Sequence, residues 1–116
     1  MADAGSNTVL ILLGNGDGTF GAPATFSVGN TPIAMLAADF NNDGKLDLAV
    51  ANYGDGTVTL LLGTGDGTFT QPSGPPYAVG RGRTTSSIAA ADLNGDGKLD
   101  IAVANLDGTV SILLQQ

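Results

Sequence analysis

Two short aspartate-rich loops hold the residues of this sequence that are best suited to chemistry. In the first loop, side-chain oxygens recur at positions 1, 3, 5 and 9, and the backbone carbonyl at position 7 falls on the same spacing. A second loop repeats this pattern further along the chain. A hard cation such as Ca²⁺ takes about six to eight oxygen ligands, and alternate residues of a tight loop can converge on one point. The sequence therefore predicts two Ca²⁺ ions per chain, one held by Asp39, Asn41, Asp43, Lys45 and Asp47 and the other by Asp92, Asn94, Asp96, Lys98 and Asp100.

The helix-flanked calcium loops of known proteins fit this pattern less well. An EF-hand needs a glutamate at position 12, where this chain has Val50 and Val103, and it needs flanking helices. Dockerin-type loops agree at positions 1 to 6 but lead into helices, which the segment Leu48–Asn52 does not indicate. The remaining alternative is a pair of turns that bind no metal. The same ligand spacing in two loops makes this alternative less favoured, and Gly44 and Gly97 stand at position 6, where a calcium loop must bend sharply.

Composition excludes several other kinds of chemistry. The chain has no Cys and no His, which removes thiol and imidazole catalysis, the usual zinc sites and disulfides. All 11 acidic residues are Asp and only 4 residues are basic, for a formal net charge of −7. Without a basic patch we expect no binding to nucleic acid. Because the clustered aspartates are assigned to the metal loops, and no Glu or His is present, we expect no enzyme activity.

The loops lie inside a repeat of about fifty residues. Residues 7–20 match residues 56–69 at ten of fourteen positions, and residues 39–52 match residues 92–105 at eleven of fourteen. A period of this length is typical of solenoids and propeller blades. The 18 Gly, 5 Pro and lack of Glu favour strands and turns over helices. We therefore expect an all-β fold of four-stranded antiparallel β-propeller blades, about two per chain, in one segment over residues 1–116.

Each complete repeat is expected to supply four strands. Partial repeats are expected over residues 7–32 and 86–116, around a complete one over residues 33–80. In that central repeat the apolar runs and turn residues predict strands at Ile33–Ala38, Asp47–Asn52, Thr57–Leu62 and from about Thr68 to Val79. The first aspartate loop then joins the first two of these strands.

The Gly-Asp-Gly-Thr-Phe segments are interpreted as hairpin turns. Asp17 and Asp66 faintly resemble calcium-binding nonapeptides, but those units occur in tandem and here the copies lie far apart. Glycine supplies the positive φ that tight hairpin turns need. We expect Phe20 and Phe69, which follow the turns, to pack between blades.

Two blades alone would expose large apolar faces and unpaired strand edges. A propeller needs about four or more blades to close a ring. We therefore expect homo-oligomerisation, with three or four chains per ring and the terminal strands of one chain completing a blade of the next. In such a ring Asn7–Leu13 and Thr109–Leu114 compete for one strand position.

The loops and turns together resemble the FG-GAP/VCBS repeats, which are related to the propeller of the integrin α subunit. The shared pattern is D-x-N-x-D-G-x-x-D, an apolar strand and G-D-G-T-F. It is found at Asp39–Asp47, Leu48–Asn52 and Gly65–Phe69, again at Asp92–Asp100 and Ile101–Asn105, and in part at Gly16–Phe20. The resemblance implies a β-propeller with Ca²⁺ between the first two strands of each blade, in secreted or cell-surface proteins that bind other molecules. Family members usually carry a whole seven-bladed ring, so this chain is short.

Three functions remain open on the sequence alone. The first is a calcium-stabilised scaffold or interaction module with a protein ligand. The second is a carbohydrate-binding lectin propeller, which is less favoured because the chain has no Trp, 2 Tyr and 4 Phe. The third is a designed or reconstructed propeller without a natural ligand. The insertion Gln71–Ser87 carries Arg81, Arg83 and Tyr77, which either bind an anion or a sugar or form a solvated connection.

The sequence also gives expectations about targeting. Residues Met1–Asn7 have neither the basic nor the apolar region of a signal peptide. The longest apolar runs are far too short to cross a bilayer, so we expect no contact with a membrane.

Overall fold

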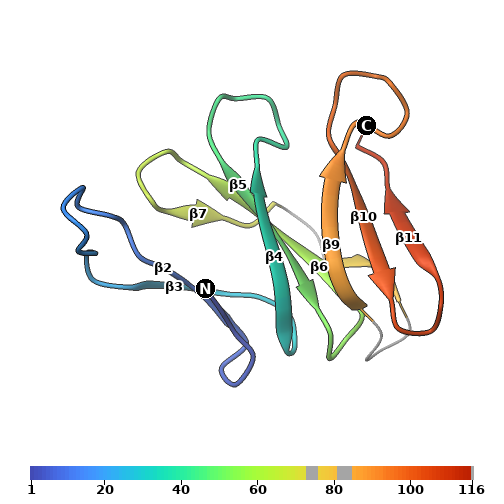
Figure 1. Cartoon of the computed structure of the whole chain (residues 1–116), viewed down its shortest axis with the longest axis horizontal. Coiled ribbons are helices and arrows are strands. Elements are labelled where there is room, and N and C mark those ends of the chain that lie inside the picture. Colours follow the sequence, from blue (N-terminus) through green and yellow to red (C-terminus); the bar gives the residue numbers. More distant parts are fainter. Residues whose placement is uncertain (73–75, 81–84, 116) are drawn as a thin grey trace.

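The fold is built from three antiparallel sheets that follow one another in chain order. The computed structural model describes residues 1–72, 76–80 and 85–115, and every regular element in those ranges is a strand (Figure 1). No described residue belongs to a helix that could cross a membrane. The expected all-β fold, with sheets like propeller blades, is confirmed. The strands are β1 (Ala2–Asp3), β2 (Thr8–Ile11), β3 (Ala24–Ser27), β4 (Pro32–Ala38), β5 (Asp47–Asn52), β6 (Thr57–Gly63), β7 (Phe69–Thr70), β8 (Tyr77–Ala78), β9 (Thr85–Ala91), β10 (Asp100–Asn105) and β11 (Val110–Leu113).

The central sheet, formed by β4 to β8, has four strand positions. Its order is β4-β5-β6-β7, and β8 also pairs with β6. The outer edge of β6 is shared, because β7 pairs with its end and β8 with its beginning. The sequence predicts a fourth strand that runs from about Thr68 through the Pro-rich stretch to Val79, whereas the described residues form two short pieces there. Pro72 and Pro76, between the two pieces, have no N–H to donate to a ladder.

The N-terminal sheet, formed by β1 to β3, is equivalent to the outer part of the central sheet. Val9 on β2 pairs with Phe26 on β3, just as Val58 on β6 pairs with Tyr77 on β8. Ala2 on β1 pairs with Val9, just as Ala51 at the end of β5 pairs with Val58. The strand that begins the chain is therefore the counterpart of the end of a second strand. A short strand that the sequence does not predict thus precedes Asn7–Leu13 in the chain.

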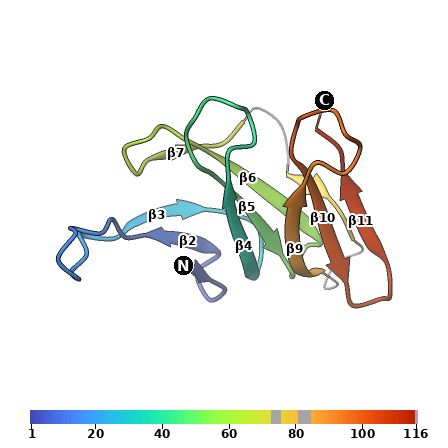
Figure 2. The same ribbon diagram turned by 45° about the horizontal axis from the view of Figure 1, so that its top comes forward.

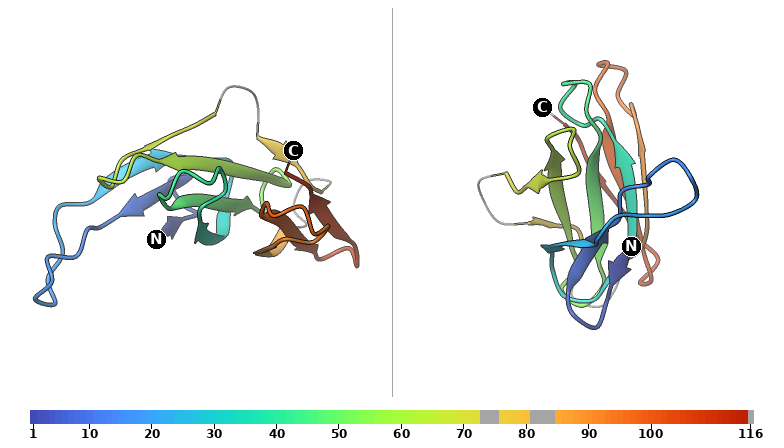
Figure 3. Two further views of the ribbon diagram at one scale, coloured as in Figure 1. Left: turned by 90° about the horizontal axis from the view of Figure 1, so that it is seen from above. Right: turned by 90° about the vertical axis from the view of Figure 1, so that its left-hand side faces the viewer.

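The C-terminal sheet has the order β11-β10-β9, and within the described residues no strand pairs with the outer edge of β11. Seen from above, the three sheets follow one another across the molecule (Figure 3). The central and C-terminal sheets approach most closely at their inner strands, where Cα atoms of β4 and β9 lie within 8 Å of each other. Three of the seven residues in each of these two strands are Ala.

The apolar core lies between the sheets. Val9 of the N-terminal sheet packs with Leu48, Val50 and Leu61 of the central sheet. On the other side of the central sheet, a second cluster comprises Phe40, Ala49, Val58, Val79, Ile101 and Val103. Every residue of β5 is buried, because this strand is covered on both faces, as its nearly continuous apolar sequence predicts.

Candidate metal sites

Both aspartate loops lie at the same end of the molecule. One joins β4 to β5 and the other joins β9 to β10, and both project beyond the sheets (Figure 1, Figure 2). At position 6 of the loops, Gly44 and Gly97 have φ angles of 81° and 83°, the left-handed conformation that glycine adopts without strain. At position 4, Asn42 and Gly95 are also left-handed, with φ of 59° and 76°. These residues turn each loop back over its first aspartate.

The aspartate at position 1 organises each loop from within. In the second loop, the Asp92 carboxylate accepts hydrogen bonds from the backbone N–H groups of Gly95 (2.8 Å), Asp96 (3.1 Å) and Gly97 (2.8 Å). The bond from Gly97 is the largest cause that lowers the pKa of Asp92, so this carboxyl group is held in its charged form. The corresponding bonds in the first loop run to Asp39 from the N–H groups of Asp43 (3.1 Å) and Gly44 (2.8 Å).

The aspartate at position 9 is fully buried, and both of its carboxylate oxygens are used by the backbone. Asp47 accepts the N–H of Phe40 at 2.9 Å and the N–H of Gly63, at the end of β6, at 2.9 Å. Asp100 accepts those of Leu93 (2.9 Å) and Gln115 (2.9 Å). A buried carboxylate is tolerable only with such partners. The sequence pattern predicts these two residues as ligands, but it does not indicate that they tie each loop to the end of a third strand.

The second loop brings its three carboxylates together. Oxygen atoms of Asp92, Asp96 and Asp100 lie within 4.8 Å of one another. Among the residues that the structure describes, no other three acidic side chains meet this distance. In the first loop Asp39, Asp43 and Asp47 are therefore spread more widely, although their spacing in the sequence is the same.

Asn41, at position 3 of the first loop, lies between two carboxylates. Its amide group donates hydrogen bonds to the Oδ1 atoms of Asp39 and Asp43, each at 3.0 Å. Position 3 thereby links positions 1 and 5 of the loop.

The other predicted ligands lie in the loops as well. The backbone N–H of Lys45 donates to Asp43 at 2.9 Å, and that of Lys98 donates to Asp96 at 3.0 Å. These bonds fix the turn between positions 5 and 7. The carbonyl groups of both lysines, and the side chain of Asn94, stay predicted ligands.

The Gly-Asp-Gly turns do what the sequence indicates. Asp66 accepts hydrogen bonds from the hydroxyl groups of Thr64 and Thr68 and from the Thr68 N–H, which together lower its pKa to about 2. Asp17 has a lowered pKa mainly because the Thr19 hydroxyl donates to it. Both aspartates stabilise their own turns, so these residues are turn formers.

The two phenylalanines that follow the turns differ. Phe69 packs between sheets, edge to face with Phe26, with ring centroids 5.4 Å apart. Phe20 is 64% exposed, so the expectation that it packs between blades does not hold within one chain. Of the possible anion or sugar site, Tyr77 is half exposed, and Arg81 and Arg83 lie outside the described residues.

Stacked antiparallel sheets with an acidic loop between the first and second strands define a propeller-like repeat protein. The chain belongs to the family of FG-GAP-like repeats, whose pattern matches it twice, over residues 1–50 and 39–103. The predicted resemblance is thereby confirmed, and the second match includes both aspartate loops. Comparisons with curated proteins and with solved structures gave no match.

Proposed function

We propose that this chain is a calcium-stabilised β-propeller scaffold without catalytic activity, which presents binding surfaces outside the cell. The observation that carries the proposal is the group of three carboxylates in the second loop, within 4.8 Å of one another at the ligand spacing of an FG-GAP-like repeat. Carboxylates this close repel one another unless a cation or protons lie between them. Oxygen-rich loops of this kind suit Ca²⁺.

The residues present fit such an ion. In the second loop Asp92, Asn94, Asp96 and Asp100, with the carbonyl of Lys98, would hold it. In the first loop Asp39, Asn41, Asp43, Asp47 and the carbonyl of Lys45 would do so. Bound Ca²⁺ supplies positive charge that neutralises the carboxylates and stiffens the loop, so its binding free energy adds to the stability of the fold.

Self-association into a ring of three or four chains is part of this proposal. Val110 and Ile112 on β11, the edge strand of the C-terminal sheet, form an exposed apolar row with Leu114, which directly follows the strand. In the central sheet the same face of the third strand is covered by the C-terminal sheet, through Val58 and Leu60. The exposed row therefore resembles a face that in this fold is covered by a further blade.

Calcium binding is tested by removing one exposed ligand from each loop. We expect Asp43→Ala and Asp96→Ala to lower the thermal stability in Ca²⁺ more than in EDTA, because an ion at 100 times its Kd contributes about 2.7 kcal/mol. Calorimetric titration should find two sites in the unchanged chain and one in each variant. Asp17→Ala, in a turn away from both loops, is the matched control. Equal losses of stability in both buffers would rule out the assigned sites.

A further inference from the structure

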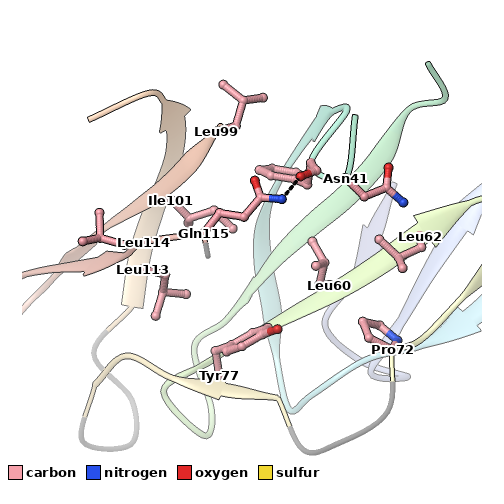
Figure 4. A pocket seen from close by; sticks show the side chains of 11 residues that line it. Asn41, Leu60, Leu62, Pro72, Tyr77, Leu99, Ile101, Leu113, Leu114 and Gln115 are labelled. Atoms are coloured by element: carbon pink, nitrogen blue, oxygen red, sulfur yellow. Dashed lines mark hydrogen bonds between the residues drawn. The ribbon is translucent and has the colours of Figure 1, made fainter. Parts of the chain in front are cut away.

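An open groove lies between the central and C-terminal sheets. It has a volume of about 450 Å³, and its walls are mostly apolar (Figure 4). We call it the rim groove, because it opens beside the third strands rather than at the closely packed inner strands. Its main side chains come from β6, β8 and the end of the chain, namely Leu60, Leu62, Tyr77, Leu113 and Leu114.

The equivalent place between the N-terminal and central sheets is filled. The registers make Ile11 the counterpart of Leu60, Phe26 that of Tyr77, and Leu61 that of Leu113. Ile11, Phe26 and Leu61 belong to one apolar cluster, and Phe69 packs into it from the start of the fourth strand. The ring of Phe69 meets Phe26 edge to face at 79°. An aromatic ring from the G-D-G-T-F turn thus completes that contact between sheets.

The C-terminal sheet has no such ring of its own within the described residues, because no strand follows β11 there. At the other end of the molecule, Phe20 occupies the same place in the sequence G-D-G-T-F as Phe69. It is 64% exposed, and within the described residues no further sheet covers it. The rim groove beside the C-terminal sheet therefore lacks an aromatic ring from a G-D-G-T-F turn, and the ring of Phe20 beside the N-terminal sheet lacks an apolar pocket.

We propose that Phe20 of one chain inserts into the rim groove of a second copy and packs against Tyr77 there. This inference rests on the proposed self-association and names the surfaces that make it. The contact is heterologous, with different surfaces on the two chains, so it repeats from copy to copy and can close a ring. The proposed contact is the same whether β2 of one chain or β11 of the other supplies the third strand of the shared blade, because the G-D-G-T-F turn follows that strand position in either case.

Gln115 controls access to the groove. Gln115 is the counterpart of Gly63 in the central sheet. The N–H group of Gly63 donates to Asp47, and that of Gln115 donates to Asp100, the buried aspartate at position 9 of each loop. A Cβ atom on Gly63 would lie 3.3 Å from the ring of Phe69, which places this position directly under the inserted ring. The Gln115 side chain donates to the Phe40 carbonyl, and its buried Oε1 has no hydrogen-bond partner among the described residues. It has to turn outward when Phe20 enters, so Gln115→Gly should strengthen association.

The absence of cysteine from the chain allows a direct test by disulfide formation. Chains that carry Phe20→Cys are mixed with chains that carry Tyr77→Cys, in Ca²⁺ and with oxidised glutathione, and disulfide-linked dimers are measured. We expect about tenfold more dimer than with Leu106→Cys and Tyr77→Cys, because a disulfide needs Cβ atoms about 4 Å apart. Leu106 is a matched control, since its exposure of 67% is close to that of Phe20. A chain that carries both Phe26→Cys and Phe69→Cys is the positive control, because these two residues form the equivalent contact within one chain.

Light scattering on the same chains separates the possible failures. We expect Phe20→Ala to weaken association about 100-fold, because a large aromatic side chain at the centre of an interface dominates its affinity. Oligomers that form without preferential linkage of positions 20 and 77 would overturn this inference and leave the proposed self-association intact. Chains that stay monomeric at all concentrations would overturn both.

Discussion

At the scale of single residues, the aspartates of the two loops divide into two kinds. Asp43 and Asp96 are exposed and accept hydrogen bonds only within their loops, so their carboxylates are placed to act as metal ligands. Asp47 and Asp100 are buried and hold two segments of backbone together with or without an ion. One sequence pattern therefore combines metal ligands with a structural carboxylate.

The first prediction concerns this structural carboxylate. Asp47→Asn keeps the size of the side chain but turns an amide group toward a backbone N–H that needs an acceptor. We expect it to lower the free energy of unfolding by about 2–3 kcal/mol even in EDTA, the usual range for a buried bond to a charged group. Urea denaturation in EDTA measures the loss.

Asp43→Asn, four residues away on the exposed part of the same loop, is the control for this substitution. Its effect in EDTA should be within about 0.5 kcal/mol of zero. If both variants lose the same stability in EDTA, the backbone bonds of Asp47 do not stabilise the fold as described.

The residue scale also shows where prediction from sequence ends. The spacing of oxygen side chains was enough to find both loops, because the ligands of a tight loop are close in the chain. The bond between Asp47 and Gly63 spans 16 residues and follows only from the pairing of β5 with β6. Likewise, the sequences of the two loops do not indicate that the three carboxylates lie closer together in the second loop than in the first.

At the scale of elements, the third strand of the central sheet supports the first loop. A Cβ atom added to Gly63, the last residue of β6, would lie 2.0 Å from the carbonyl oxygen of Leu46. The loop therefore lies directly on the backbone of β6, and only glycine permits this approach. The position of the candidate metal site thus depends on a residue that ligates nothing.

The second prediction follows from that contact. Gly63→Ala should push the loop away from β6, reduce stability by about 1–3 kcal/mol, as overpacking does, and weaken Ca²⁺ binding at the first loop. Calorimetric titration should show one weakened site and one unchanged site. Gly14→Ala is the matched control, because Gly14 is the counterpart of Gly63 in the N-terminal sheet, and an added Cβ there would meet only the ring of Phe20, at 3.9 Å. Unchanged binding at both sites would mean that the loop does not rest on this strand.

Elements were predicted well where their signal is local. β5 has the predicted bounds, and β4 and β6 each extend one residue further, because apolar runs between turn residues define strands. The fourth strand was predicted poorly, since β7 and β8 are two residues long and depend on the edge of β6. β1 was missed for the same reason, because two residues give no periodicity to recognise.

At the scale of the whole molecule, the exposed row on β11 should contribute to association. We expect light scattering to find a discrete trimer or tetramer in millimolar Ca²⁺, which loosens or dissociates in EDTA. Ile112→Lys should shift the chain to monomer, because a charge in an apolar edge strand opposes pairing with another chain. Leu106→Lys, an equally polar change on an exposed turn, should not. A monomer that EDTA does not affect would contradict both the ring and the role of calcium.

The alanine-rich inner strands have a geometric consequence. Ala38 of β4 and Ala90 of β9 contribute to the cluster between the sheets near their closest approach, whereas Leu60 and Leu113 lie at the wider outer side. Because small side chains separate the sheets at the inner strands and large ones separate them at the outer strands, each sheet is rotated by an angle relative to the sheet before it. Successive angles add up to an arc, and the arc decides how many blades complete a circle. A larger residue in place of Ala90 would flatten the arc, so the blade number of such a ring is set by side-chain volume at its inner side.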